Sequence, residues 1–223
     1  YLLALSAIAI LYGGFTALAQ SDLKKLVAYS SVGHMGFATL GIFVLNPNGV
    51  EGAVLVMINH GVTTGALFIG VGIIYERLHS RDLNAAAGIG KFMPVFMGFL
   101  GVFCLSSLGF PGTNSFIGEF LVLAGSFAYS KTLTICLVPG VVIAAAYMLR
   151  MLQRVAWGGT NNPKHHDLAD LEFREIITLV PLLGFVFWIG LNPQPFVRVM
   201  HVTVLHLLQQ VGQTLPAAAA ALP

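Results

Sequence analysis

The sequence predicts an all-α membrane protein: a polytopic transmembrane helical bundle of about six spans, one of them a discontinuous helix broken near residues 109–114. Hydrophobic residues make up 57% of the 223 residues and charged residues only 9%, whereas soluble globular domains carry about 25% charged residues. The few charges are clustered, and most runs between them reach the roughly 20 residues of a membrane span. The net charge of +2 does not indicate a nucleic-acid partner, because the basic residues fall in the connections between these runs.

Six spans and a C-terminal segment can be placed from the distribution of these apolar runs. The spans are 1–20, 26–46, 52–75, 92–129, 132–153 and 176–192. The first is apolar all round, and Gly13-Gly14 permits close approach of another helix. The fifth contains Pro139-Gly140, which we expect to kink it. We assign residues 1–195 to the transmembrane bundle, and 196–223 to an amphipathic helix with a frayed, alanine-rich tail.

The fourth span, 92–129, is interrupted by the sequence Gly-Phe-Pro-Gly-Thr-Asn at 109–114. Each flank is shorter than the roughly 20 residues of a crossing, so we interpret the whole segment as one discontinuous helix. Non-helical backbone at membrane depth is tolerated only where protein or a water-filled cavity covers it. Glu119 lies in the early turns after the break, where the helix dipole favours a carboxylate. A carboxyl group in a membrane indicates a functional site; the alternative is a packing kink with a Glu that only caps or hydrogen-bonds.

The distribution of Lys and Arg predicts the orientation. With six crossings, nine of the 11 basic residues fall on one side, and only Lys131 and Arg198 fall on the other. Short cytoplasmic loops accumulate Lys and Arg, so we expect the first side to be cytoplasmic and both ends of this piece to be periplasmic. Separate crossings by 92–108 and 115–129 would weaken the split to about seven against four, which favours one broken crossing.

Two histidines lie deep in consecutive spans. Ser30-Ser31 share a helical face with His34, and Thr63-Thr64 share one with His60. At about 1.5 Å per residue, His34 lies roughly 12 Å below the cytoplasmic edge and His60 close to the middle of the membrane. A single such histidine is more often a hydrogen-bonded packing residue. Two at similar depth, followed by a carboxylate on the next span, favour a proton relay, because His titrates near neutral pH.

The connections add little to this site. Lys24, in the short turn after the first span, is a further candidate for the relay, although a snorkelling anchor is its ordinary explanation. The mixed-charge segment 75–82 is typical of a solvated loop, with docking to a neighbour as the alternative. The loop 154–175 contains His165-His166, a poor metal site because neighbours in sequence point to different faces.

Motifs for redox or nucleotide chemistry are missing from the sequence. There is no Walker motif, dinucleotide fingerprint, iron–sulfur cysteine cluster or histidine pair spaced for haem. We interpret Cys104 and Cys136 as buried small hydrophobes rather than disulfide or metal ligands. We therefore expect no cofactor and no metal in this chain. The first residue, Tyr1, is not an initiator Met and no signal peptide follows, so we expect a piece of a longer chain.

Five stretches carry a resemblance to a known family. They are DLKKLVAYSSVGHMG at 22–36, INHGVTTGALF at 58–68, YERLHSR at 75–81, GFPGTNSFIGEF at 109–120 and PQP at 193–195. Together they resemble the antiporter-like membrane subunits of respiratory complex I, the NADH:quinone oxidoreductase, and most closely the M type (subunit 4 in mitochondria). The resemblance covers about residues 1–200 in order.

The resemblance implies a fourteen-helix subunit built from two inverted five-helix repeats, of which this piece would be helices nine to fourteen. His34 and His60 match the family's central-axis histidines on helices ten and eleven. Glu119 matches the acidic group on the broken twelfth helix, where the sister L and N types are expected to carry Lys. The short tail after residue 195 also argues against the L type. The first half, with its paired Glu and Lys, and the lysine of the eighth helix are missing from this chain.

The resemblance also implies a function. The parent protein would translocate protons across the bacterial inner (plasma) membrane through His34, His60 and Glu119, coupled to quinone reduction elsewhere in the complex. NADH, FMN, iron–sulfur clusters and quinone are expected in partner subunits. The expected partners are the L- and N-type membrane subunits, the lateral helix of the L type, and the lipid bilayer.

Three other functions stay open at this point. The chain could belong to a multisubunit cation/proton antiporter or a membrane-bound hydrogenase that uses the same type of subunit. It could be a passive scaffold with vestigial polar groups. It could also be a solute carrier, since broken helices bind small anions and Na⁺.

Overall fold

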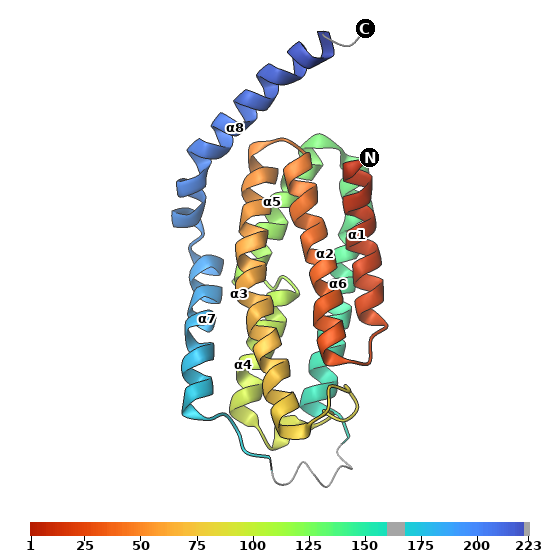
Figure 1. Ribbon diagram of the computed structural model, residues 1–223, viewed down its shortest axis with the longest axis vertical. Coiled ribbons are helices and arrows are strands. Elements are labelled where there is room, and N and C mark those ends of the chain that lie inside the picture. Colours follow the sequence, from red (N-terminus) through yellow and green to blue (C-terminus); the bar gives the residue numbers. More distant parts are fainter. Residues whose placement is uncertain (160–167, 221–223) are drawn as a thin grey trace.

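The chain folds into a long bundle of helices, with one further helix leaving it at one end (Figure 1). The computed structural model describes residues 1–159 and 168–220, and side chains as far as residue 212. The described elements are α1 (Leu2–Leu18), α2 (Leu23–Phe43), α3 (Pro47–Leu78), the short 3-10 helix η1 (Ile89–Lys91), α4 (Pro94–Ser107), α5 (Asn114–Tyr129), α6 (Lys131–Trp157), α7 (Phe173–Leu191) and α8 (Gln194–Ala220). The prediction of an all-α membrane bundle is confirmed.

The discontinuous helix is confirmed. α4 ends at Ser107 and α5 begins at Asn114, and the backbone between them contains Gly109 at φ +77° and Gly112 at φ +95°. These left-handed conformations suit glycine, which has no Cβ to clash. α6 starts directly after α5 and runs back along the bundle until Ala156 meets Gly90, just before α4. α4 and α5 together therefore span the same length as the single helix α6, which corresponds to one crossing of the membrane.

α3 is the central helix of the bundle. It packs mainly against α2 and α5 and also contacts α4, α7 and α8. Its contact with α5 is close because glycines of each helix face the backbone of the other: a Cβ at Gly118 would lie 2.9 Å from Val56 N, and one at Gly52 would lie 2.7 Å from Val122 N. α1 and α2 approach in the same way, since a Cβ at Gly13 would lie 2.7 Å from the backbone of α2. Helices in membranes associate through such small-residue contacts.

Helix ends differ by several residues from the predicted spans 26–46 and 52–75. α2 already begins at Leu23, where Asp22 accepts a hydrogen bond from the N–H of Lys25 at 2.9 Å. α3 begins at Pro47, capped by Asn46. The charge-free runs misplaced these ends because capping residues, and not the nearest charge, decide where a helix starts.

Four described helices, α2, α3, α6 and α7, are long and apolar enough to cross a membrane alone. α1, with 17 residues, and α4, with 14, are shorter apolar helices. At about 1.5 Å per residue α1 is roughly 26 Å long, close to the thickness of a bilayer core. α4 reaches across only in combination with α5, which agrees with the six spans predicted.

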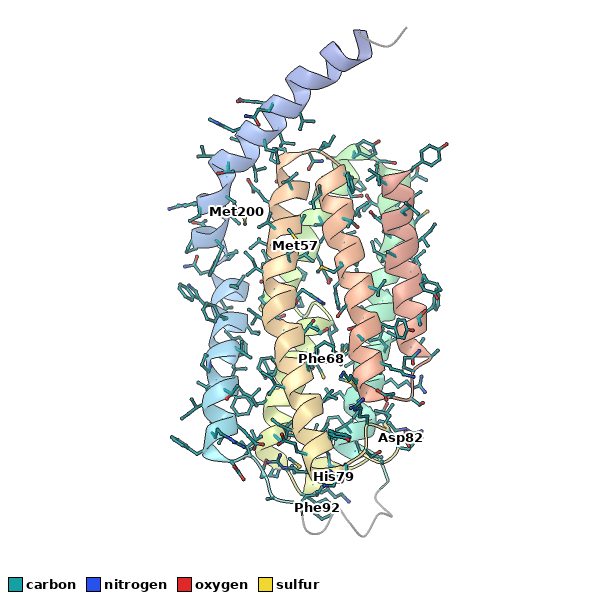
Figure 2. All side chains as sticks on the ribbon, in the orientation of Figure 1. Met57, Phe68, His79, Asp82, Phe92 and Met200 are labelled. Carbon is teal, nitrogen blue, oxygen red and sulfur yellow. The ribbon has the colours of Figure 1, made fainter. Side chains whose placement is uncertain are left out.

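Arg77 stabilises the end of the bundle at which most of the basic residues lie. Its guanidinium donates to both carboxylate oxygens of Glu175, at 2.9 and 2.7 Å, and to the carbonyls of Ala169 and Asp170. The Asp170 carboxylate in turn accepts the N–H groups of Val95 and Phe96 at the start of α4. These bonds hold α3, α4 and α7 together. His79, Asp82 and Phe92 mark this end in Figure 2, and Met200 of α8 lies towards the other.

α8 lies against the opposite end of α3 and extends beyond the bundle (Figure 1). His201 Nδ1 and Oε1 of the buried Glu51 lie 2.6 Å apart, which fastens α8 to α3. The backbone stays helical through Ala220, across most of the alanine segment expected to fray. Alanine has the highest intrinsic helix propensity, which favours this continuation.

Three further expectations have separate outcomes. α6 continues through Pro139 and Gly140 as one helix, so these residues do not interrupt it; the kink expected there stays a prediction. Cys104 is buried as expected, but Cys136 is exposed because it lies on the outward face of α6 beside Ile135. Lys164 and His165-His166 lie outside the described residues.

Candidate functional site

A buried carboxylate and a buried imidazole form the centre of the site. Glu119 of α5 and His34 of α2 lie 2.8 Å apart, measured from Oε1 to Nδ1. Their exposures are only 5% and 6%. Burying a carboxylate without a partner is costly, and a charge-assisted hydrogen bond offsets that cost. The two residues are 85 positions apart in sequence, and the fold brings them together near the middle of the bundle.

The break in the helix positions the carboxylate. α5 begins at Asn114, so Glu119 lies in its second turn, near the positive end of the helix dipole. The backbone of the break also runs close to it, since a Cβ at Gly109 would lie 3.2 Å from Glu119 Oε2. A continuous helix would place neither the helix start nor this glycine beside the carboxylate.

The second nitrogen of His34 contacts two further helices. Its Nε2 lies 3.4 Å from Ser107 Oγ at the end of α4 and 3.4 Å from the hydroxyl of Tyr147 in α6. If Nδ1 carries a hydrogen and donates to Glu119, Nε2 is free to accept from either hydroxyl; in the imidazolium form both nitrogens donate. The same partners can therefore bond to the neutral and to the protonated form of the His34 ring.

His60 lies next to this pair. Its ring centroid is 5.8 Å from that of His34, and its Nδ1 lies 3.0 Å from Thr64 Oγ1 on the same helix. The structure thus brings His34, His60 and Glu119 together, as their similar predicted depth suggested. Lys24 is exposed at the start of α2. Ten residues of helix, about 15 Å, separate it from His34, so it does not join the cluster.

A network of uncharged polar side chains surrounds the break. Asn114 Oδ1 accepts from Ser106 at 2.5 Å and from Thr63 at 3.2 Å, and these two hydroxyls are 2.9 Å apart. Asn59 Nδ2 donates to the backbone carbonyl of Asn114 at 2.7 Å. These bonds tie the start of α5 to α3 through Asn59 and Thr63, and to the end of α4 through Ser106.

Several of these residues were not singled out from the sequence. Tyr147 is an isolated polar group in an apolar run, and only the packing of α6 shows that it faces inward. A detectable signal existed for Ser107, because the Ser106-Ser107 pair directly precedes the break. Asn59 precedes His60 in the sequence, but nothing in the sequence indicates a role for it.

A small cavity lies between the three titratable groups. Its volume is about 10 Å³, which is roughly the room that one water molecule requires. The residues around it are His34, Val56, Asn59, His60, Thr63, Thr64, Ser107, Ser115 and Glu119. All but one of these side chains are polar.

Two apolar clusters enclose this polar layer. One, towards the basic end, contains Leu26, Leu67 and Phe103. The other, towards the end that carries α8, contains Phe37, Val56 and Val122. The polar groups therefore form a layer in the middle of the bundle with apolar packing on both sides.

The site suits proton exchange. An imidazole hydrogen-bonded to a carboxylate passes a proton over a short distance, and His titrates in the physiological range. Within residues 1–159 and 168–220, no three His, Cys, Asp or Glu side chains are grouped so that they could hold a metal ion.

The sequence matches a known family of membrane proteins. The profile of the family described as NADH:quinone oxidoreductase/Mrp antiporter, TM, matches residues 1–144. The chain belongs to this family. The match includes α1 to α5 with His34, His60 and Glu119, and it confirms the resemblance predicted from the five motifs.

Similar proteins agree with this membership. The NADH-ubiquinone oxidoreductase chain 4 of Chondrus crispus is 41% identical over 96% of this chain and 44% of its own length. The NADH-quinone oxidoreductase subunit M of Rickettsia bellii is 40% identical over 93% of this chain and 42% of its own length. A chain in the solved respiratory complex I from Thermus thermophilus with bound NADH is 30% identical, with a TM-score of 0.87 over 93% of this chain and 44% of that one. The chain thus spans less than half the length of these relatives.

Proposed function

We propose that this chain is the proton-translocating part of an M-type membrane subunit of a NADH:quinone oxidoreductase. The observation that carries the proposal is the buried contact of His34 with Glu119, with His60 beside it, at the break of a transmembrane helix. The names of the similar proteins support the choice of this enzyme complex. The redox chemistry and its NADH, FMN, iron–sulfur clusters and quinone belong to other subunits.

Electrostatics supplies a mechanism for moving the proton. A proton that arrives on His60 creates a positive charge 5.8 Å from the His34 ring. At an effective dielectric constant of about 20, two such charges repel by roughly 3 kcal/mol. When His34 is itself protonated, this repulsion favours transfer of its Nδ1 proton to Glu119, which leaves both His34 and Glu119 neutral. The loss of the carboxylate charge in turn favours release of the proton held by His60. Charges supplied by neighbouring subunits would drive the cycle in the same way.

The expected setting is the bacterial plasma membrane. The basic end of the bundle would face the cytoplasm, because short loops rich in Lys and Arg stay on that side. L- and N-type membrane subunits, and the lateral helix of the L type, are the proposed neighbours. Lys24 would then be an interfacial anchor rather than a member of the relay.

A cation/proton antiporter is the second candidate, because the family itself includes the Mrp antiporters. Gene neighbours discriminate between the two. Genes for a quinone-reducing module beside this one favour the oxidoreductase, and a run of antiporter subunit genes favours the second candidate.

Replacing Glu119 with glutamine tests the proposal. Glutamine keeps the size and one acceptor oxygen, but it does not take up a proton, so we expect the assembled complex to oxidise NADH while pumping fewer protons per electron. The ratio of protons to electrons is measured in inverted membrane vesicles with a pH indicator. An unchanged ratio in the E119Q complex would refute the role of this subunit in proton translocation.

A further inference from the structure

We infer that Asn59 binds a water molecule through its side-chain oxygen and that this water carries the proton between His60 and the His34–Glu119 pair. Asn59 is then a positioning residue of the path. The inference rests on the proposed function and adds to it a binding site and a residue for its central step.

The orientation of the Asn59 amide is fixed by its partner. Nδ2 lies 2.7 Å from the backbone carbonyl oxygen of Asn114. A carbonyl only accepts, so the amino group of Asn59 has to face it, and Oδ1 points elsewhere. The side-chain amide of Asn114 makes the reciprocal bond: its Nδ2 donates to the backbone carbonyl of Asn59 at 3.4 Å. The helix break therefore sets the direction of Oδ1.

That oxygen lacks a protein partner. Among the buried side-chain nitrogen and oxygen atoms of the described residues, Asn59 Oδ1 alone has no hydrogen bond, although the residue is only 1% exposed. Neighbouring polar groups such as Thr63, Ser106 and Asn114 are all bonded to each other. Native proteins rarely leave a buried acceptor unpaired, so such an atom points to a bound polar ligand.

The cavity beside Asn59 fits that ligand. Asn59 lines it together with His34, His60 and Glu119, and its volume of about 10 Å³ suits a single water. A buried water needs two to four polar partners. Asn59 Oδ1 supplies an acceptor, and the histidines, the carboxylate and the nearby Ser115 supply the others.

A bridging water would also close the gap between His60 and the His34–Glu119 pair. Hydrogen bonds of the described residues connect His60 to Thr64 but not to His34 or Glu119, and the two imidazole centroids are 5.8 Å apart. A polar gap of this size is commonly spanned by water. An amide oxygen is suited to hold this water because it accepts a hydrogen bond without taking the proton away.

The test uses the assembled complex and two variants of Asn59. They differ from each other only in that one carries a methyl group where the other carries a hydroxyl. Asn59→Val removes the acceptor and fills the space with methyl groups, whereas Asn59→Thr has nearly the same shape and keeps an oxygen. We expect Asn59→Val to slow proton translocation per assembled complex about tenfold, the effect of losing one strong hydrogen bond, and Asn59→Thr to slow it about threefold or less.

Asn46 provides a matched control. It also links α3 to α5, since its Nδ2 donates to the carbonyl of Gly125 at 2.8 Å, but its Oδ1 already accepts from the N–H of Gly49. Asn46→Val should lower the amount of assembled complex without changing its proton-to-electron ratio. Equal losses of translocation in Asn59→Val and Asn59→Thr would show a merely structural clamp and overturn the inference.

A map of the unmodified complex gives an independent readout, which stands even if the variants fail to assemble. Cryo-electron microscopy at a resolution that shows ordered water should place one within hydrogen-bond distance of Asn59 Oδ1. Absence of that density while other buried waters are visible would overturn the inference. Since Glu119→Gln tests proton translocation itself, a normal Asn59→Val complex beside a defective Glu119→Gln complex would reject the water site and leave the proposed function standing.

Discussion

Replacing His34 with glutamine is expected to reduce proton transfer through this subunit by about 100-fold or more while the complex still assembles. Glutamine keeps a donor for the carboxylate of Glu119, but its amide does not take up and release a proton near neutral pH, as an imidazole does. A positioned acid or base typically contributes a factor of about 10² to 10⁴. The measurement is the proton-to-electron ratio in membrane vesicles, normalised to the amount of assembled complex.

Replacing His34 with leucine should, in addition, lower the amount of assembled complex. It leaves Glu119, which is 5% exposed, without its partner at Nδ1. Removing one member of a buried pair costs about 3 to 5 kcal/mol, less where the remaining carboxyl takes up a proton. The amount of assembled complex should therefore fall in H34L but not in H34Q. The exposed His79, in the loop after α3, serves as the control, since H79N should change neither quantity. Normal pumping by H34Q would contradict the relay.

Replacing Gly190 with alanine is expected to disturb the site from a distance. A Cβ at Gly190 of α7 would lie 2.7 Å from Thr113 Cα and still closer to the carbonyl oxygen of Gly112. Both contacts are to the backbone of the helix break, which does not move aside as a flexible side chain does. The cost of such overpacking is about 1 to 3 kcal/mol, and a displaced break would also move the backbone beside Glu119.

A second glycine of α7 is the control for this change. A Cβ at Gly184 meets no atom within 4 Å, and alanine is the better helix former. Thermal inactivation of the purified complex should occur earlier in G190A than in the unmodified protein and unchanged or later in G184A. Equal stability of the two variants would show that α7 does not hold the break in place.

Most of the fold follows from the sequence, because a membrane restricts the choices. The segment 109–114 contains two glycines and a proline between flanks too short to cross alone, and the structure interrupts the helix there. The ends of the helices were predicted less well from the sequence. The charge-free runs excluded Lys24, Lys25 and Glu51 from the spans, yet all three are helical, since caps such as Asn46 set the ends.

The site could be predicted only in part. His34, His60 and Glu119 were recognisable because ionisable groups are rare in such segments and these share a similar depth. The sequence does not reveal which way an uncharged polar side chain on an apolar helix points. The contact of Tyr147 with His34 is therefore seen only once α6 packs against α2. The unpaired side-chain oxygen of Asn59 is likewise seen only once α3 packs against α5.

The most direct test follows the proton on Glu119 itself. Infrared difference spectroscopy of the assembled complex, recorded between resting and turnover states, reports the C=O stretch of a protonated carboxyl group. If His34 and Glu119 exchange a proton in the buried layer, a carboxyl band should appear or vanish on turnover in the unmodified complex and be missing in E119Q. A carboxyl band that persists unchanged in E119Q, or no carboxyl change at all during turnover, would contradict the proton relay.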